Sequence, residues 1–373
     1  MNKKSLEKNL ENSSKLDKST QIEVWLGRLF LVLISISICF LILEYLSRRY
    51  LVTGSQFEQE FPVWVGRAPK PYVMFGGMPG AYIAENVYLN KLGYKGPAPE
   101  LVGNDQVKKE FRIFILGGST IFNGDPPIPT LLEQKFKEQG YKNVRVYNFG
   151  VVSSVSSQEL VRVLMEVLDY RPDITIMYNG FNDFGEPLAW DPRPGYPFNF
   201  IVYENNPILE SNIEKYKFWS LLLYGSNFLR FFLGNYFVSQ FIDLNEMRKK
   251  VNYQTPAWED EIINVYVNNF KKASKILIAY HSKFVGIYQP NANYIKKKSS
   301  DDYWERMRTK LQAKISGLKQ IEKFDFYDYS NIYSDISEKV FVDSVHTEQK
   351  FKNIVSNRIF KDIKNLVPLK FKK

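Results

Sequence analysis

Residues that bind metals or form disulfides are scarce in this 373-residue chain, which has one cysteine and two histidines. The cysteine, Cys39, lies inside an apolar run, so the chain has no disulfide framework and no cysteine-based metal site. The sequence contains no Cys/His metal-finger spacing and no nucleic-acid-binding signature, and its lysines are mostly scattered, so the net charge of +10 does not indicate a nucleic-acid partner. We expect no metal, no cofactor and no nucleic acid.

One long apolar run stands near the N-terminus. Residues 1–20 are polar and rich in lysine, and we expect them to form a disordered tail. From Trp25 to Leu46 the chain is almost entirely apolar, which is long enough for a helix to cross a membrane. A cleaved signal peptide would need a small-residue site, whereas Glu-Tyr-Leu-Ser-Arg-Arg-Tyr follows Leu43. The sequence therefore predicts an uncleaved anchor.

Charges on either side of this run predict its orientation. Basic residues before it outnumber Arg48 and Arg49 after it, so the N-terminus is expected to be cytoplasmic and the rest of the chain to lie outside. The expected organisation is a cytoplasmic tail over residues 1–24, a membrane span over 25–47, a linker over 48–84 and one domain over 85–373.

The rest of the chain alternates short β-branched or aromatic runs with amphipathic stretches, which is typical of a parallel sheet covered by helices. We expect a three-layer α/β/α domain with a parallel sheet of about five strands. The expected strands are Phe111–Leu116, Val144–Phe149, Ile174–Tyr178, Phe284–Tyr288 and Phe324–Tyr329, and the clearest helices are Gln158–Leu168 and Ile262–Tyr280.

Residues of about 185–260 interrupt this alternation. Three prolines come first, and an aromatic stretch from Tyr216 to Phe241 follows. Gly225, Ser226 and Asn227 break that stretch and exclude a second membrane span. An active-site cap, a membrane-facing patch and helices packed on the core are the three interpretations that the sequence leaves open.

The first three strands end in glycines or short polar residues. Ser119 follows two glycines at the end of the first strand, which is the sheet edge where ligands bind in open α/β folds. Gly150 ends the second strand, and Asn182 follows the third. Acyl transfer needs donors around the tetrahedral oxyanion, and the N–H groups of Ser119 and Gly150 with the Asn182 amide would provide three. Asn182 could instead be only a turn residue.

A nucleophilic serine needs a base, and the only histidines are His281 and His346. Asp343 stands three residues before His346 and could orient its imidazole. Thr347 is expected to cap a final helix. His281 closes the helix before the fourth strand, and we interpret it as structural.

Taken together, these motifs resemble the four blocks of the SGNH (GDSL-like) hydrolase superfamily, in its membrane-anchored bacterial form. The matching positions are Gly117-Gly118-Ser119, Gly150, Gly180-Phe181-Asn182-Asp183 and Asp343-Ser344-Val345-His346, and the lead-in Leu89 to Gly96 also looks like that of anchored members. The resemblance implies a flavodoxin-like sheet, with Ser119 as nucleophile, His346 as base, Asp343 as its orienting carboxylate, and Ser119, Gly150 and Asn182 as the oxyanion hole. One departure is Gly118, where the family's commonest motif has aspartate.

The expected reaction is ester hydrolysis through an acyl-enzyme on Ser119, without cofactor. For an anchored, outward-facing member, the expected substrate is an O-acylated, for example O-acetylated, glycan of the cell envelope, and transfer of the acyl group is the variant that the sequence does not separate from hydrolysis. A lipid esterase or thioesterase is one alternative. A non-catalytic glycan-binding or assembly protein on the same fold is the other.

Overall fold

The structure is a computed structural model, in which the residues form two compact units. One comprises Met1–Glu60 with Asn206–Phe241, and the other comprises Phe61–Asn205 with Ile242–Lys373. The second unit therefore begins before residue 85, and the stretch outside it is narrower than the expected 185–260 insertion. Residues 51–67 of the expected linker over 48–84 lie outside the described residues. Most of Tyr216–Phe241 also lies outside them. The structure describes residues 3–50, 68–84, 87–101, 110–204, 225–229, 231–232, 243–294, 302–319 and 325–372.

Helix α1 (Lys3–Tyr50) dominates the described part of the first unit. The expectation of a disordered tail is wrong, because the backbone is helical from Lys3 onward. No glycine or proline interrupts the chain before Gly27, so the helix of the apolar run continues backward at little cost. Within α1, Gln21–Tyr50 is long and apolar enough to cross a membrane. Its apolar side chains are exposed all along this stretch.

The second unit is built on a five-stranded sheet whose neighbouring strands are all parallel. The strand order is β6-β5-β7-β8-β9, so the first strand in the chain has neighbours on both sides. All five predicted strands are present, and the α/β fold is confirmed. Their bounds are β5 (Phe111–Gly117), β6 (Val144–Gly150), β7 (Ile174–Asn179), β8 (Lys283–Tyr288) and β9 (Asp325–Asp328).

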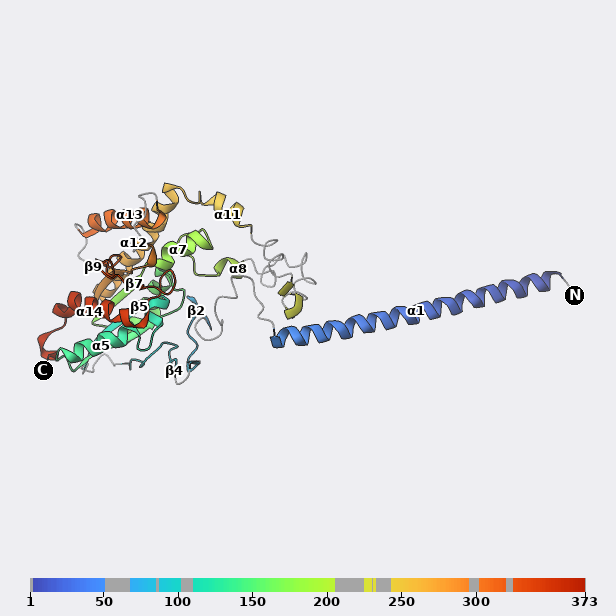
Figure 1. Ribbon diagram of the computed structural model, residues 1–373, viewed down its shortest axis with the longest axis horizontal. Coiled ribbons are helices and arrows are strands. Elements are labelled where there is room, and N and C mark those ends of the chain that lie inside the picture. The colour runs from blue at the N-terminus through green and yellow to red at the C-terminus, as the bar shows by residue number, and fades with distance from the viewer. Residues whose placement is uncertain are drawn as a thin grey trace. The chain divides into compact units, whose positions relative to one another are not determined.

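Side chains on the two faces of the sheet pack into two separate cores. In β5, Ile113 and Ile115 pack into one core with α5 (Ile128–Glu138) and α14 (Lys352–Ile363). Phe114 and Leu116 point to the other core, which α12 (Pro256–Ala279) and α13 (Tyr303–Lys319) cover. Successive residues of a strand face opposite sides, so a fully apolar strand such as β5 fits a sheet covered on both faces. Figure 1 shows the two helical layers with the sheet between them.

The remaining elements are shorter. The predicted helix Gln158–Leu168 is divided into α6 (Ser156–Arg162), a π-helical turn (Val163–Val167) and a 3-10 turn (Leu168–Tyr170). Two small hairpins precede the sheet, formed by β1 (Ala68–Lys70) with β2 (Met74–Gly76) and by β3 (Tyr82–Ala84) with β4 (Val87–Tyr88). The other helices are α4 (Ser119–Phe122), α7 (Phe181–Ala189), α8 (Phe200–Glu204) and α11 (Leu244–Lys250), and the other 3-10 turns are Ala292–Tyr294, Gln349–Phe351, Lys364–Leu366 and Leu369–Phe371.

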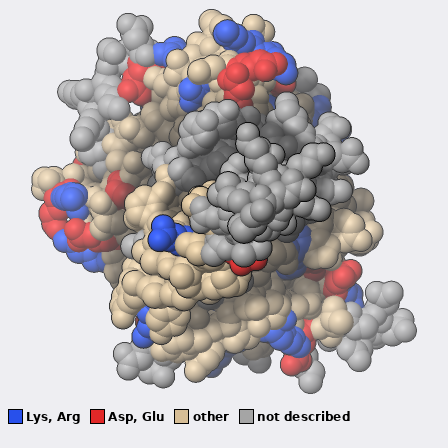
Figure 2. Space-filling view, turned by 90° about the vertical axis from the view of Figure 1, so that its right-hand side faces the viewer, with Lys and Arg blue, Asp and Glu red and all other residues tan. Residues whose placement is uncertain are grey.

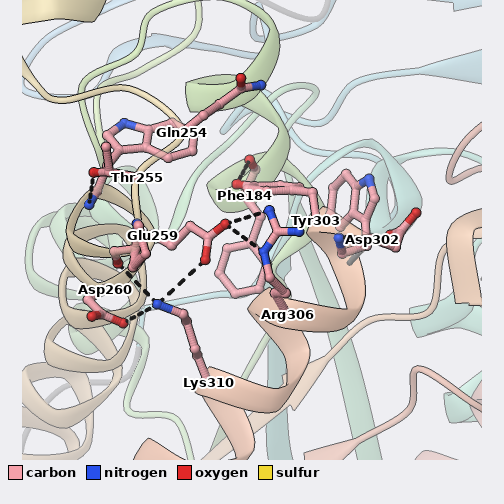
Figure 3. A network of polar contacts seen from close by, with 12 residues as sticks. Phe184, Gln254, Thr255, Glu259, Asp260, Asp302, Tyr303, Arg306 and Lys310 are labelled. Carbon is pink, nitrogen blue, oxygen red and sulfur yellow. Dashed lines mark hydrogen bonds and ion pairs between the residues drawn. The ribbon is translucent and has the colours of Figure 1, made fainter. Parts of the chain in front are cut away.

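A charged clamp joins α12 to α13. Figure 3 shows Arg306 and Lys310 of α13 directed at Glu259 of α12, whose side chain is buried. The Arg306 guanidinium donates to Glu259 Oε1 over 3.0 and 2.8 Å, and Lys310 Nζ lies 3.5 Å from Oε2. A buried carboxylate needs such partners to offset its desolvation. Tyr303, which lies beside this clamp, donates to the Phe184 carbonyl of α7 over 2.8 Å and so links α13 to α7.

Candidate active site

The carboxyl ends of β5 and β7 meet where the strand order reverses, which is where open α/β sheets bind ligands. Ser119 comes two residues after the end of β5 and is the first residue of α4. Asn182 comes three residues after the end of β7, near the start of α7. The topology thus brings together two of the predicted residues that are 63 positions apart in the sequence.

Ser119, His346 and Asp343 form a continuous hydrogen-bonded chain. Ser119 Oγ lies 2.7 Å from His346 Nε2, and His346 Nδ1 lies 2.6 Å from Asp343 Oδ2. An ionised carboxylate only accepts, so this contact holds the imidazole proton on Nδ1 and leaves the Nε2 lone pair for the Ser119 hydroxyl. The arrangement has the connectivity of a nucleophile, a base and an orienting carboxylate.

The loop between Phe341 and Thr347 presets the position of Asp343. A backbone bond from Val342 N to His346 O, 2.8 Å long, closes the loop. Within it, the N–H groups of Val345 and His346 donate to Asp343 Oδ1 over 2.8 and 2.7 Å. Burial alone would raise the pKa of Asp343, but these N–H donors and the imidazole outweigh it and hold the pKa below the ordinary value. Asp343 is therefore ionised at neutral pH.

Gly118 leaves the space that Asn182 occupies. A Cβ atom at Gly118 would lie 2.7 Å from Asn182 Nδ2, so a side chain there would displace the amide. Asn182 Nδ2 donates to the Ser154 carbonyl over 2.8 Å, which orients one amide hydrogen and leaves the second for a ligand. The glycine at position 118 thus allows close packing of the Asn182 amide on the backbone before Ser119.

Gly150 does not have the role that the sequence predicts. It lies inside β6 opposite Gly117, and its N–H donates to Asn148 Oδ1 over 2.9 Å. A Cβ atom there would lie 2.6 Å from the Phe122 nitrogen, so the glycine is needed for close packing against α4. We correct the prediction accordingly, because this N–H is already committed within the strand.

Sequence reasoning missed the turn that follows β6. Ser153 has a left-handed backbone with a φ of 59°, and Ser154 provides the carbonyl that holds Asn182. Both serines are buried. Non-glycine residues rarely adopt this conformation, and when they do the site is worth inspecting for function. The only sequence signal is the run of short polar residues directly after a buried strand.

Buried ionisable side chains lie behind this turn. Arg162 Nη1 donates to Ser154 Oγ over 3.2 Å, and Asn179 Nδ2 donates to Glu159 Oε2 over 2.6 Å. Glu159 and Arg162 are fully buried. Burial, reinforced by the nearby Asp183 carboxyl, raises the pKa of Glu159 to about 8.

Asp183, the residue after Asn182, is part of the same buried group. The backbone N–H of Ser156 donates to its Oδ1 over 2.9 Å, which ties α7 to the start of α6. Burial raises the pKa of Asp183 to about 6, although hydrogen bonds from Ser156 oppose the rise. Within the predicted motif Gly180 to Asp183, the Asn182 amide therefore packs on Gly118, next to Ser119, whereas Asp183 faces the protein interior.

Two lysines hold the loop that follows α4. Lys352 Nζ donates to the Asn123 carbonyl over 3.1 Å, and Lys95 Nζ donates to the Gly124 carbonyl. Burial, followed by the charge of Lys95, lowers the pKa of Lys352 to about 8. Lys95 belongs to the lead-in segment, in which Leu89 pairs with Lys95 in an antiparallel bridge. The predicted lead-in thus supports the loop that follows the short helix α4.

Two further predictions concern His281 and Thr347. His281 lies just after α12 with a φ of 59°, in the turn that leads to β8. Thr347 is not the cap of the last helix, because it pairs with Phe341 in the loop, and α14 begins only at Lys352 after a 3-10 turn. The pairing with Phe341 closes the loop that holds Asp343 and His346, and it takes precedence over helix capping. Within the described part of the chain, no group of three or more His, Cys, Asp or Glu side chains is placed to hold a metal ion.

Comparisons with known proteins find solved structures only. No family model and no curated protein matches the sequence. An acetylxylan esterase from Geobacillus stearothermophilus is 10% identical, with 68% of this chain and 94% of the esterase covered and a TM-score of 0.42. A GDSL-like lipase from Bacteroides thetaiotaomicron is 14% identical, with 70% and 92% covered and a TM-score of 0.38. A gut microbial diltiazem-metabolizing enzyme is 13% identical at a TM-score of 0.41, with 69% of this chain but only 47% of the enzyme covered.

Proposed function

We propose that this protein is a membrane-anchored serine ester hydrolase that removes O-acyl groups from a glycan of the cell envelope. The observation that carries the proposal is the contact of 2.7 Å between Ser119 Oγ and His346 Nε2, continued by the contact of 2.6 Å to Asp343. A serine hydroxyl is a weak nucleophile until such a base removes its proton.

The reaction begins when Ser119 Oγ attacks the ester carbonyl and its proton passes to His346 Nε2. The ester bond then breaks, the proton moves to the leaving alcohol, and the acyl group remains on Ser119. Water repeats the sequence in the deacylation step: it gives a proton to His346, attacks the acyl carbonyl, and releases the carboxylic acid while Ser119 regains its proton. Ionised Asp343 stabilises the imidazolium that forms in both steps.

Charge that develops on the carbonyl oxygen needs preorganised donors. Ser119 is the first residue of α4, and the first N–H groups of a helix have no partner inside it. The second amide hydrogen of Asn182 is the other donor in this proposal. In place of Gly150 we propose the N–H of Ser153, since the Ser153-Ser154 turn lies against the same Gly118-Asn182 contact.

The proposed substrate, an O-acylated polysaccharide, is supported by the exposure of the site and by the proposed anchor. The side chains of Asp343 and His346 are 53% and 22% exposed, so the base stands near the surface, where a bulky polymer can approach. The apolar stretch Gln21–Tyr50 and the basic residues before it support an extracytoplasmic hydrolase domain. On the face drawn in Figure 2, basic and acidic side chains of the described residues are mixed rather than separated by sign.

Labelling and turnover together test the proposal. The full chain in detergent should react with a fluorophosphonate and release acetate from acetylated glycans, and Ser119→Ala should abolish both activities. His346→Ala should lower turnover by several orders of magnitude. His281→Ala is the matched control and should leave turnover nearly unchanged. Preference for long-chain esters would instead support a lipid esterase, and absence of labelling in the folded protein would indicate a non-catalytic binding protein.

A further inference from the structure

A short aromatic segment of the first unit is docked on the last turns of α1. We define the aromatic segment as residues 225–229 and 231–232, which are helical except for residue 226. It lies about 180 residues after its contact on α1, as the bond from Ser226 Oγ to Glu44 Oε2 shows. Tertiary contacts therefore hold the aromatic segment on α1.

Glu44 is the centre of that contact. Its carboxylate accepts from Ser226 Oγ over 2.7 Å, from the Asn227 N–H over 2.9 Å and from the Phe228 N–H over 3.1 Å. Ser226 Oγ in turn accepts from the Leu229 N–H over 3.1 Å. The N–H groups of residues 227–229 are thus paired. Complete pairing is what a backbone needs where water is scarce, because an unpaired N–H in a bilayer costs several kcal/mol.

Arginine and amide groups complete the contact from the α1 side. Arg48 Nε lies 2.7 Å from Glu44 Oε1, and Arg48 Nη2 donates to the Gly225 carbonyl over 2.9 Å. Asn227 Nδ2 donates to the Ser47 carbonyl over 3.3 Å. The Glu44 side chain is left only 15% exposed. A charged group at the end of an apolar span is costly, and these partners neutralise and solvate it.

The phenylalanines of the segment continue the apolar surface of α1. The Phe228 ring packs edge-on against Phe40, with centroids 6.3 Å apart, and Phe232 packs on Phe228 at 5.0 Å. Phe40 lies one turn before Glu44, about 6 Å further into the span. Phe231 and Phe232 are nevertheless 44% and 63% exposed. Large exposed aromatic rings that extend a lipid-facing helix fit the boundary between head groups and acyl chains.

We propose that the aromatic segment is a second membrane contact, which lies in the outer interface and places Phe231 and Phe232 among the lipids, with Glu44 as its fixing point. The inference rests on the proposed membrane anchor. The chain leaves the hydrolase unit after Asn205 and re-enters it at Ile242, so this contact ties the hydrolase to the bilayer at a second place in the sequence besides the end of α1. Of the three interpretations of the insertion, this proposal corresponds to the membrane-facing patch.

Fluorescence quenching in the full chain tests the proposal. In a Cys39→Ser background, Phe232→Cys is labelled with an environment-sensitive nitrobenzoxadiazole dye in vesicles of phosphatidylcholine and phosphatidylglycerol. Spin-labelled phosphatidylcholine should quench the dye, whereas iodide in the water should not. Leu33→Cys in the middle of α1 is the lipid-exposed reference, and Tyr280→Cys on the hydrolase unit, which is 61% exposed, is the water-exposed reference.

The outcomes distinguish failure of this inference from failure of the proposed membrane anchor. If the dye at residue 33 is lipid-quenched but the dye at residue 232 is quenched by iodide, the aromatic segment is in water and the inference is wrong. Shielding of residue 232 from both quenchers would mean that protein covers it, which also overturns the inference. Iodide quenching at residue 33 would overturn the anchor, and this inference with it.

A variant pair tests the role of Glu44. Glu44→Ala should expose the dye at residue 232 to iodide while the dye at residue 33 stays lipid-quenched, because only the aromatic segment loses its fixing point. Glu23→Ala, at the exposed beginning of the same apolar stretch, is the matched control and should change neither dye. Unchanged quenching at residue 232 in Glu44→Ala would overturn the assignment of Glu44.

Discussion

Asn182 could be a turn residue or an oxyanion donor, and its surroundings favour the second role. Its amide is held by the Ser154 carbonyl over 2.8 Å and lies directly over Gly118, next to the nucleophile. A turn residue would not need a glycine opposite its amide. The neighbouring residue Asp183 has the structural role instead, because it is buried and bonded to Ser156.

Asn182→Ala should therefore lower turnover by about 10²–10³, with a smaller effect on KM, because one of several oxyanion donors is lost. The remaining backbone donors keep some activity. Turnover and melting temperature are to be measured on the same preparation. A lower melting temperature with normal turnover would show that Asn182 only supports the turn.

At the scale of elements, α6, which packs behind the Ser153-Ser154 turn, contains a buried ionisable group. Glu159 is bonded to Asn179 at the end of β7 and is fully buried beside Arg162. Its pKa is about 8 in the folded protein against an ordinary 4.5, so the folded state retains a proton that the unfolded state releases. The free energy of unfolding should then fall as the pH rises from about 5 to about 8.

Glu159→Gln should remove most of this dependence, because glutamine keeps an acceptor for Asn179 but does not titrate. The difference between pH 5 and pH 8 should shrink by on the order of a few kcal/mol, and thermal unfolding at both pH values measures it. Glu138→Gln, at an exposed position of α5, is the control. Parallel pH profiles for wild type and Glu159→Gln would contradict the assignment.

At the scale of the whole molecule, the proposed catalytic residues and the apolar stretch of α1 belong to different units. Ser119, Asp343 and His346 all lie in the unit formed by Phe61–Asn205 and Ile242–Lys373. The span lies in the other unit, together with the aromatic segment. The unit that contains the sheet has its own two cores, one on each face of the sheet, and neither includes any of the α1 side chains that the structure describes.

Deleting residues 1–49 should consequently leave turnover on a small soluble ester within about threefold of the full chain, because no group in the reaction is removed. Turnover of the fragment and of its Ser119→Ala variant provides the measurement. Loss of activity in a fragment that retains its circular dichroism would show that the span contributes to the site.

The sequence by itself determined the features that depend on neighbours along the chain. Apolar runs of the right length predicted the five strands and the apolar helix. The Asp343 to His346 spacing predicted a base with its orienting carboxylate, because a three-residue interval within one loop already brings both side chains together. The Gly-Gly-Ser turn at the end of a strand likewise located Ser119. None of these conclusions required knowledge of which distant segments meet.

Only the tertiary structure decided which groups surround the nucleophile and what holds them. Gly150 was expected to donate to the oxyanion, but its N–H is taken by Asn148, and the position of that amide is set by its bond to the Ile121 carbonyl of α4. The Ser153-Ser154 turn, the buried Glu159 and the contact of Glu44 with residue 226 leave no local pattern, because each depends on partners from another element. Burial and hydrogen-bond geometry are properties of the assembled chain, and they determine whether a polar residue is a donor, a support or an anchor point.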